Sequence, residues 1–359
     1  MRTCLVVGTG LIGTSIALAL RAHGVVVHLT DRDHSAARRA ADLGAGTTEQ
    51  PAEQVDLAVV AVSPSATAEV VSGLLAGNVA ATVVDTCGVK ERVLREVAAT
   101  VGPAPHFVGT HPMAGRERSG PGAARADLFE GRPWAVSASG ADERSLARVA
   151  LLLRLCGAVP VEIDAAAHDA AVALVSHVPQ VAASLVAARL ADGDDTALAL
   201  TGQGVRDVTR VAASDPDLWV EVLLANAEPV ARVLAELRQD VDAVVHALHE
   251  VSEDPEWART SLREVLLRGN AGQARLPGKH GGRSTAYRAV PVVLADRPGE
   301  LARLVVDVGS AGVNIEDIRI EHSPGQPVGL VELSVAPGSE AGLGAALERL
   351  GWVVHAEGP

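Results

Sequence analysis

Residues 8–13 read Gly-Thr-Gly-Leu-Ile-Gly and lie between an apolar run with a strand pattern, Thr3–Val7, and a helical pattern, Gly10–Ala22. Glycines in such a strand–loop–helix unit let the chain turn tightly and let its backbone approach a pyrophosphate at the helix N-terminus. The stretch therefore predicts a dinucleotide-binding domain. Its expected cofactor-binding residues are Gly8, Gly10, Leu11, Ile12 and Gly13.

The next apolar run, Val25–Thr30, ends at Asp31, where a carboxylate can accept hydrogen bonds from an adenosine ribose. A carboxylate at this place repels the 2′-phosphate of NADP, so we expect NAD as the cofactor. The neighbouring Arg32, also assigned to cofactor binding, keeps NADP as the alternative. Ser63 is expected to border the same crevice, because open α/β sheets bind ligands outside the carboxyl ends of their strands.

Short apolar strands and helical segments such as Val89–Ala99 alternate over residues 1–164. This alternation predicts a Rossmann-type α/β domain, a parallel sheet with helices on both faces. Val159–Ile163 is expected to be one further strand of this domain. The other predicted strands are Thr3–Val7, Val25–Thr30, Leu57–Val62, Thr82–Asp85, His106–Thr110 and Trp134–Ser137.

Residues 165–270 lack strand alternation and consist of long helical runs rich in Ala, Leu and Val, so we expect an all-helical domain. Ser214-Asp215-Pro216 predicts a helix start, because a capping side chain precedes a proline whose missing N–H costs nothing in the first turn. So much apolar helix in one stretch favours the core of a homodimer. An intramolecular bundle is the alternative explanation of the same pattern.

Residues 271–285 belong to a glycine-rich, basic stretch that predicts a linker. Beyond it, residues 286–359 show the order βαββαβ, which predicts a ferredoxin-like domain whose middle strands join through a turn at His322–Pro327. The expected strands are Tyr287–Leu294, Asn314–Glu321, Val328–Val335 and Trp352–His355, and the expected helices are Glu300–Gly309 and Ala341–Leu350.

The composition excludes several classes of function. The 359 residues have a mean hydropathy of +0.22, which argues against a disordered chain. A net charge of −13 without any basic block argues against binding to nucleic acid or to an anionic membrane surface. We find no uninterrupted apolar run long enough to span a membrane, so no membrane association is expected.

Cysteine usage and the N-terminal residues both indicate a cytoplasmic protein. Cys4, Cys87 and Cys156 are far apart and form neither a CxxC motif nor a disulfide framework. Residues 2–20 loosely mimic an export signal, but cleavage there would remove the glycine motif, so we expect the segment to remain in the folded domain. The histidines show no spacing typical of a zinc site, and no metal is expected.

A histidine that could act as a base follows the predicted strand His106–Thr110. His111 would then lie at a carboxyl end of the sheet, where the nicotinamide of a bound cofactor is placed. Imidazole titrates near neutrality and can accept a hydroxyl proton while hydride leaves the same carbon. A histidine that only caps the loop is the alternative.

The helical part contains two further polar groups. His177 and Gln180 are three residues apart and share a helix face, which Pro179 is expected to kink. Arg210 is suited to hold a carboxylate, and Asp207, three residues earlier, could orient it. A core histidine and an ordinary helix salt bridge are the simpler explanations of the two groups.

These motifs occur in one order, and together they closely resemble the prephenate/arogenate dehydrogenases of tyrosine biosynthesis. The resemblance covers residues 1–270, and the C-terminal segment looks like an ACT domain. The motifs that carry it are the glycine loop with Asp31, Asp85–Lys90, His111–Gly120, His168-Asp169 at an expected helix start, Ser176–Pro179, Gly204–Trp219, Asp296–Leu301 and Asn314-Ile315.

The resemblance implies an NAD-dependent oxidoreductase that decarboxylates prephenate to 4-hydroxyphenylpyruvate and CO₂. His111 would accept the proton of the ring C4 hydroxyl as hydride passes to NAD⁺, and loss of CO₂ would make the ring aromatic. Arg210 would hold a substrate carboxylate. The resemblance also assigns His177 to the catalytic residues, and Glu117, Gln180, Asp207 and Trp219 to substrate binding.

Two positions depart from the family pattern. Gly88 stands where a serine commonly helps to hold the catalytic histidine and the substrate hydroxyl. We expect lower activity from this loss, unless water or Thr86 replaces the hydroxyl. Gln180 stands where many prephenate-specific members have a histidine, so an arogenate dehydrogenase that forms tyrosine directly is the alternative.

The ACT resemblance implies a regulatory site in which loop amides receive the carboxylate of an amino acid, with tyrosine as the expected effector. An ACT unit that only dimerises is the alternative. For the whole chain, a non-catalytic amino-acid sensor is a further alternative, and Gly88 favours it. The joint presence of His111, Arg210, Asp207 and Asp31 argues against it. The expected regulatory residues are Asp296, Gly299, Asn314 and Ile315.

Overall fold

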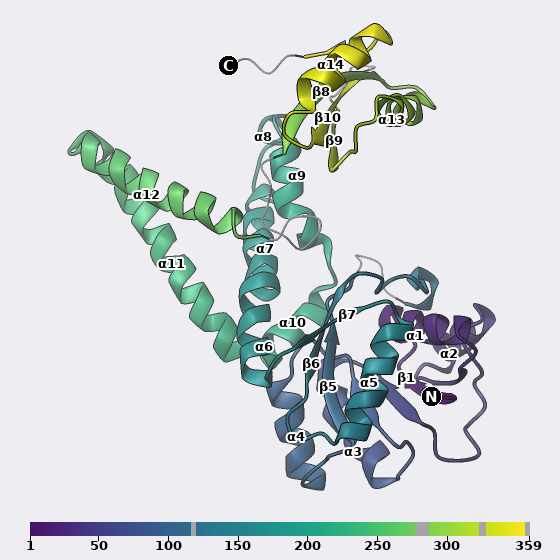
Figure 1. Ribbon diagram of the computed structural model, residues 1–359. Coiled ribbons are helices and arrows are strands. Elements are labelled where there is room, and N and C mark those ends of the chain that lie inside the picture. Colours follow the sequence, from purple (N-terminus) through teal and green to yellow (C-terminus); the bar gives the residue numbers. More distant parts are fainter. Residues whose placement is uncertain (116–119, 277–286, 323–327, 356–359) are drawn as a thin grey trace. The chain divides into compact units, whose positions relative to one another are not determined.

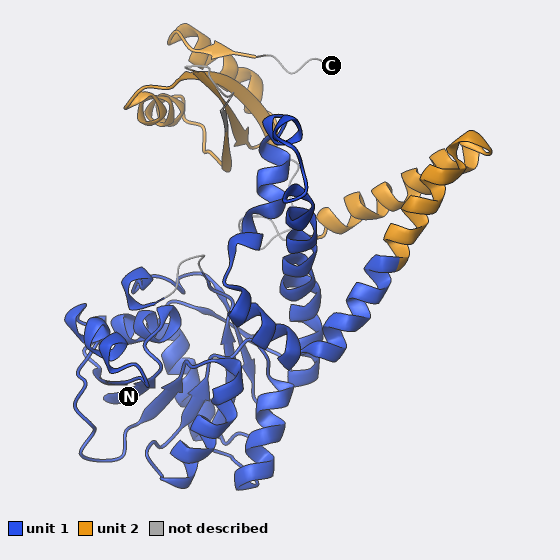
Figure 2. Cartoon of the chain, turned by 180° about the vertical axis from the view of Figure 1, so that it is seen from behind, with its two compact units in different colours: residues 1–238 blue, residues 239–359 orange. Residues whose placement is uncertain are grey.

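The structure is a computed structural model that describes residues 1–115, 120–276, 287–322 and 328–355 (Figure 1). The chain divides into two compact units, residues 1–238 and 239–359 (Figure 2). The boundary between them falls inside one long helix, α11 (Ala227–His249).

The first unit is built on a seven-stranded sheet with the strand order 2-1-3-4-5-6-7. The first five strands run parallel, as predicted, whereas the sixth is antiparallel to the fifth and the seventh follows the sixth. The prediction of a wholly parallel sheet is therefore wrong for the last two strands. The strands are β1 (Thr3–Val7), β2 (Val26–Thr30), β3 (Leu57–Val60), β4 (Val83–Asp85), β5 (Phe107–Pro112), β6 (Pro133–Ser137) and β7 (Val159–Glu162).

The reversal has a local cause. A parallel connection needs a crossover long enough to pass over the sheet, usually a helix. In the described part of residues 113–132 the only helical element is the 3₁₀ turn Pro121–Ala123, so the chain returns along β5 in the opposite direction.

Helices cover both faces of this sheet, because successive side chains of a strand point to opposite faces. On β1, Cys4 and Val6 pack with α1, α2 and α5, whereas Leu5 packs on the other face with α3 and α4. These helices are α1 (Leu11–Ala22), α2 (His34–Asp42), α3 (Pro64–Ala76), α4 (Glu91–Val101) and α5 (Glu143–Leu155).

The rest of the first unit is helical. Asp164 caps the first of these helices, so it begins three residues before the start expected at His168. A π-helical turn, Ala173–His177, precedes Pro179, whose missing N–H cannot complete an α-helical bond. The predicted start at Pro216 is confirmed, with Asp215 as the cap. The helices are α6 (Ala165–Val172), α7 (Val178–Leu190), α8 (Asp195–Ala199), α9 (Gln203–Thr209) and α10 (Pro216–Ala225).

The continuous helical run over residues 165–190 is long and apolar enough to cross a membrane, with a mean hydropathy of 1.6. The sequence-based expectation concerned an uninterrupted apolar run, and this run is interrupted by charged and polar residues, among them Asp169 and Arg189. Core helices of soluble proteins meet the same criterion. The run also carries four buried polar residues whose side chains bond within the protein, namely His168, Asp169, His177 and Gln180.

The second unit contains the end of α11, the helix α12 (Pro255–Gln273) and a small antiparallel sheet of order β11-β8-β10-β9. The predicted βαββαβ order is present, although Asn314 and Ile315 precede the second strand instead of opening it. α12 continues three residues into the expected linker, and residues 277–286 and 323–327 lie outside the described residues. The elements are β8 (Arg288–Ala295), α13 (Glu300–Ser310), β9 (Asp317–His322), β10 (Val328–Val335), α14 (Glu340–Arg349) and β11 (Val353–Val354).

Candidate active site

The glycine loop lies at the carboxyl ends of the parallel strands. Gly8 has a φ of +96°, and a Cβ there would lie 2.3 Å from the carbonyl oxygen of Ala61. A Cβ at Gly13 would lie 1.9 Å from the carbonyl oxygen of Gly8, so neither position accepts a side chain. At Gly10 a Cβ would meet no atom within 4 Å, which leaves its backbone open to a ligand.

The start of α1 is suited to an anion. Gly10 is its N-cap and gives no side-chain hydrogen bond, and its first turn holds no acidic residue. Leu11 and Ile12 place their backbone amides in this turn while their side chains pack against the core. Because amides at a helix N-terminus attract negative charge, the loop and the helix together fit the pyrophosphate of a dinucleotide.

The polar residues expected beside the loop are also at this edge. Asp31 follows β2, and its Oδ2 accepts hydrogen bonds from the amide and the hydroxyl of Thr9 at 2.6 and 2.9 Å. The carboxylate is thereby held at the edge of the glycine loop, the place that ribose binding requires. Arg32 is exposed, and Ser63 precedes α3 with its hydroxyl 3.2 Å from that of Ser65.

A buried ion pair supports the neighbouring strands. Lys90 donates from Nζ to the carboxylate of Asp85 and to the carbonyl oxygen of Thr110, the latter at 2.7 Å. The amide of Thr110 donates to Asp85 Oδ1 at 3.0 Å. These bonds tie the ends of β4 and β5 together immediately before His111. Sequence reasoning singled out the segment but not this supporting role.

His111 is the last-but-one residue of β5 and is half-buried. Its Nδ1 lies 3.0 Å from His168 Nε2, and a Cβ added at Gly88 would lie 3.8 Å from both Cε1 and Nε2. Burial, then the nearby His168, Lys90 and His177, hold the pKa of His111 well below its usual value. The imidazole is therefore neutral at neutral pH, as a proton acceptor must be.

Sequence reasoning noted His168-Asp169 as a motif but did not place it in the site. His168 Nδ1 lies 2.8 Å from Asp169 Oδ1, and both side chains are buried. The two oxygens of Asp169 also accept from the backbone amides of Lys90 and Glu91, at 2.8 and 2.9 Å, where α4 begins. The adjacent His-Asp pair was the available signal, but its partners lie about eighty residues away and could not be read from spacing.

His177 comes from the π turn and is 2% exposed. Its Nδ1 faces the amide nitrogen of Asn226 at 3.1 Å, and its ring contacts Trp219 edge to face at 6.0 Å between centroids. Burial lowers the pKa of His177 to about 4, against the opposing effect of Asp169. Asn226 had no sequence signal that could identify it.

The remaining described residues predicted to bind the substrate lie around the turn that carries Arg210. Gln180 donates from Nε2 to the carbonyl oxygen of Val211 at 2.9 Å, so it supports the 3₁₀ turn that Arg210 opens. Arg210 is exposed on this turn. Asp207, which was expected to orient Arg210, accepts a hydrogen bond from Gln203 at 2.8 Å. Glu117 lies outside the described residues.

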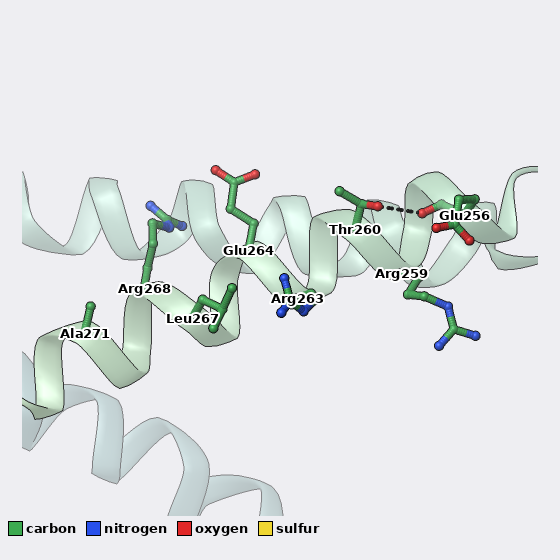
Figure 3. Close-up of a pocket in the computed structure, with 8 residues that line it drawn as sticks. All are labelled: Glu256, Arg259, Thr260, Arg263, Glu264, Leu267, Arg268 and Ala271. Carbon is green, nitrogen blue, oxygen red and sulfur yellow. Dashed lines mark hydrogen bonds between the residues drawn. The ribbon is translucent and has the colours of Figure 1, made fainter.

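The expected regulatory residues lie in the second unit. Asp296 follows β8, and Gly299, with a φ of +91°, precedes α13. Asn314 donates to Glu316 at 2.6 Å, and Ile315 packs against the core of the small sheet. A hollow on α12 is lined mainly by charged side chains and contains none of the predicted site residues (Figure 3).

The sheet and the glycine loop are those of a nucleotide-binding domain. Two family models match the chain: "Prephenate dehydrogenase, nucleotide-binding domain" over residues 16–162 and "Prephenate dehydrogenase, dimerization domain" over residues 164–266. Within the described ranges, no group of three or more His, Cys, Asp or Glu is arranged to hold a metal.

Individual relatives agree with the models. The chain is 44% identical to the probable prephenate dehydrogenase NovF of Streptomyces niveus, over 98% of this chain and 99% of that protein. It is 24% identical to the prephenate dehydrogenase of Bacillus subtilis, over 92% and 91%. The crystal structure of the Aquifex aeolicus prephenate dehydrogenase with hydroxyphenyl propionate and NAD⁺ superposes with a TM-score of 0.64 at 26% identity, over 76% of this chain and 98% of that one.

The chain therefore belongs to the prephenate dehydrogenase family. It is an NAD-binding oxidoreductase with a Rossmann-like nucleotide-binding domain and a helical domain of the family's dimerization type.

Proposed function

We propose that the protein oxidatively decarboxylates prephenate to 4-hydroxyphenylpyruvate and CO₂ in tyrosine biosynthesis. Family membership at 44% identity supports the reaction class. When bound, NAD⁺ supplies the hydride acceptor. Gly8, Gly10, Leu11, Ile12 and Gly13 would hold its pyrophosphate, and Asp31 its adenosine ribose, with Arg32 and Ser63 at the border of the crevice.

The observation that carries the proposal is the placement of His111. The residue stands at the carboxyl end of β5, and a Cβ at Gly88 would lie 3.8 Å from its Nε2. Its lowered pKa keeps the ring neutral. In the proposed reaction His111 takes the proton of the substrate's C4 hydroxyl, so the O–H bond breaks as a new N–H bond forms.

The helical residues would recognise the substrate's anionic groups. Arg210 is proposed to hold a carboxylate, because a guanidinium can form two parallel hydrogen bonds to it. His177 would donate a hydrogen bond from Nε2, since its Nδ1 faces an amide N–H group. Trp219 packs on that ring, and Gln180 would support the turn that carries Arg210. Glu117 and Asp207 remain proposed substrate-binding residues.

The proposal is tested by NADH formation from prephenate and from arogenate by the purified protein, repeated with NADP⁺. We expect turnover of prephenate with NAD⁺. Turnover of arogenate alone would show that the substrate's side chain carries an amino group, and would make Gln180 the first residue to exchange. Binding of NAD⁺ without turnover of either substrate would contradict the proposed reaction and favour the amino-acid sensor.

We also propose a cytoplasmic homodimer assembled through residues 165–270. Large apolar side chains are exposed in this part of the chain, among them Leu200 at 82% and Leu224 at 68%, and a second copy would cover such surface. The matching model is that of a dimerization domain. Sedimentation at micromolar concentration is expected to give twice the mass of the chain, and a monomer would contradict the proposal.

We propose the domain boundaries 1–164, 165–270, 271–285 and 286–359, with the last as an ACT regulatory domain. The βαββαβ order and the left-handed Gly299 before α13 support this assignment. Asp296, Gly299, Asn314 and Ile315 would form the effector site, with tyrosine as ligand. Removal of the residues after Ser284 should abolish inhibition by tyrosine, whereas unchanged inhibition would place the effector elsewhere.

A further inference from the structure

A chain of three side chains links the proposed base to the start of a helix. His111 Nδ1 lies 3.0 Å from His168 Nε2, and His168 Nδ1 lies 2.8 Å from Asp169 Oδ1. The two rings meet edge to face, with an interplanar angle of 72°. His168 is 2% exposed and Asp169 is 3% exposed, so water does not compete for these contacts.

The direction of the hydrogen bonds follows from Asp169. Its oxygens already accept from the backbone amides of Lys90 and Glu91, which can only donate. A carboxylate that receives two amide N–H groups at a helix N-terminus acts as an acceptor toward its third neighbour as well. His168 must therefore carry a proton on Nδ1.

The tautomer of His111 follows in turn. A neutral imidazole has one N–H, so in the neutral form of His168 a proton on Nδ1 leaves Nε2 as an acceptor. Only His111 Nδ1–H can then complete the 3.0 Å contact. The proton of His111 is thereby fixed on Nδ1, and Nε2 keeps its lone pair. This is the edge of the ring that lies 3.8 Å from the Cβ position of Gly88.

We propose that His168 and Asp169 are positioning residues that hold His111 in the tautomer able to accept a proton through Nε2. The inference rests on the proposed function, in which His111 takes the hydroxyl proton. After that step His111 carries a positive charge, and its Nδ1–H still donates to His168, whose own proton stays directed at Asp169. No proton has to move along the chain, because the carboxylate acts by orientation and by its charge.

The tautomer can be measured without turnover. In protein labelled with ¹⁵N-histidine, two-bond ¹H–¹⁵N correlations distinguish Nδ1–H from Nε2–H imidazoles, and the signals of His111 are assigned by their loss in His111→Asn. We expect Nδ1–H for His111. An Nε2–H signal from His111 would overturn the proposal whether or not the enzyme turns over prephenate, and absence of turnover with an Nδ1–H signal would count against the proposed function alone.

Two variants separate positioning from structure. His168→Leu removes the acceptor but leaves Asp169 at the start of α4; we expect kcat to fall by about 100-fold with KM little changed, and the Nδ1–H signal to be lost. His168→Gln can place an amide oxygen near Nδ1 and should recover most of this loss. Equal losses of kcat in both variants, or an unchanged tautomer in His168→Leu, would contradict the proposal.

The chain offers a matched control. His106 also contacts a carboxylate, Asp142 Oδ2, at 2.7 Å, but its side chain is 61% exposed. His106→Gln removes a histidine–aspartate pair of the same type outside the site. We expect it to leave both kcat and the His111 signal unchanged. Thermal unfolding of the His168 variants, measured beside this control, shows whether they keep the fold.

Discussion

The surroundings of His111 and His177 differ in the chemical kind of group that faces Nδ1. At His111 the facing atom is Nε2 of His168, and the other ring nitrogen of His168 contacts the carboxylate of Asp169. At His177 it is the amide nitrogen of Asn226, which also donates to the backbone carbonyl of Asp169 at 2.8 Å and is thereby fixed in orientation. An amide nitrogen can only donate, so the two imidazoles hold their protons on opposite atoms.

One site thereby obtains a base and a donor from the same residue type. His111 presents a lone pair at Nε2, whereas His177 presents an N–H there. Burial lowers the pKa of both rings and keeps both neutral. The neighbouring side chains, more than the histidines themselves, then decide which role each ring can perform.

The largest expected effect is that of removing the base. His111→Asn should lower kcat by about 10³-fold, because general-base catalysis contributes about 10²–10⁴-fold and asparagine cannot accept and keep a proton. The affinity for NAD⁺ should not change, since the glycine loop and Asp31 are untouched. Steady-state rates and NAD⁺ titration followed by fluorescence check both parts. Unaltered turnover would contradict the proposed role of His111 as the base.

The sequence predicted many residues of this site but not the hydrogen bonds between them. The glycine loop, Asp31 and His111 could be located because each follows a strand of clear pattern, and parallel strands bring their carboxyl ends to one edge. Asn226 could not be located, since no local pattern marks a residue that contacts a histidine 49 residues earlier in the chain. The strand β6 was predicted, but its antiparallel direction was not, because strand direction depends on the length and path of the connection.

The next largest effect is the pH dependence of the free energy of unfolding. The pKa of His177 is about 4 in the folded protein, compared with 6.5 for an ordinary histidine. Between these values the unfolded chain binds a proton that the folded protein does not, so stability falls as the pH falls from about 6.5 to about 4. The loss attributable to His177 should reach about 2–3 kcal/mol.

Urea unfolding at pH 7.0 and 4.5 measures this loss, and His177→Gln should reduce it. The exposed His34 provides the control, because His34→Gln should leave the pH dependence unchanged. An equal pH dependence in wild type and His177→Gln would show that this ring is not held neutral by burial.

A smaller effect is expected from reversing the donor at His177. Asn226→Asp places a carboxylate against Nδ1 of His177. Because a carboxylate can only accept a hydrogen bond, the proton of His177 should move from Nε2 to Nδ1. Loss of the Nε2 donor should raise KM for the substrate by about tenfold and alter kcat less, since one hydrogen bond to a charged group contributes about 1.5–3 kcal/mol. Asn270→Asp adds the same charge to the exposed surface of α12 and should change neither constant. A kcat effect larger than the KM effect would assign His177 to the chemical step.

The smallest effect concerns Gly88. A Cβ at this position would make ordinary van der Waals contact with His111, so Gly88→Ala should fold and work normally. Gly88→Ser adds a hydroxyl within reach of Nε2 and of the substrate's hydroxyl, and we expect kcat to rise a few-fold. In the structure the hydroxyl of Thr86, the other candidate for this role, donates to the carbonyl oxygen of Val60 at 3.4 Å. A serine variant no better than the alanine variant would show that the hydroxyl is dispensable here.

The most direct test of the opposite tautomers is one ¹⁵N-histidine spectrum of the wild-type protein near pH 7, with His111 and His177 assigned from their single variants. The structure predicts a neutral Nδ1–H ring for His111 and a neutral Nε2–H ring for His177. The same tautomer in both rings, or a doubly protonated ring at either position, would contradict the division into base and donor.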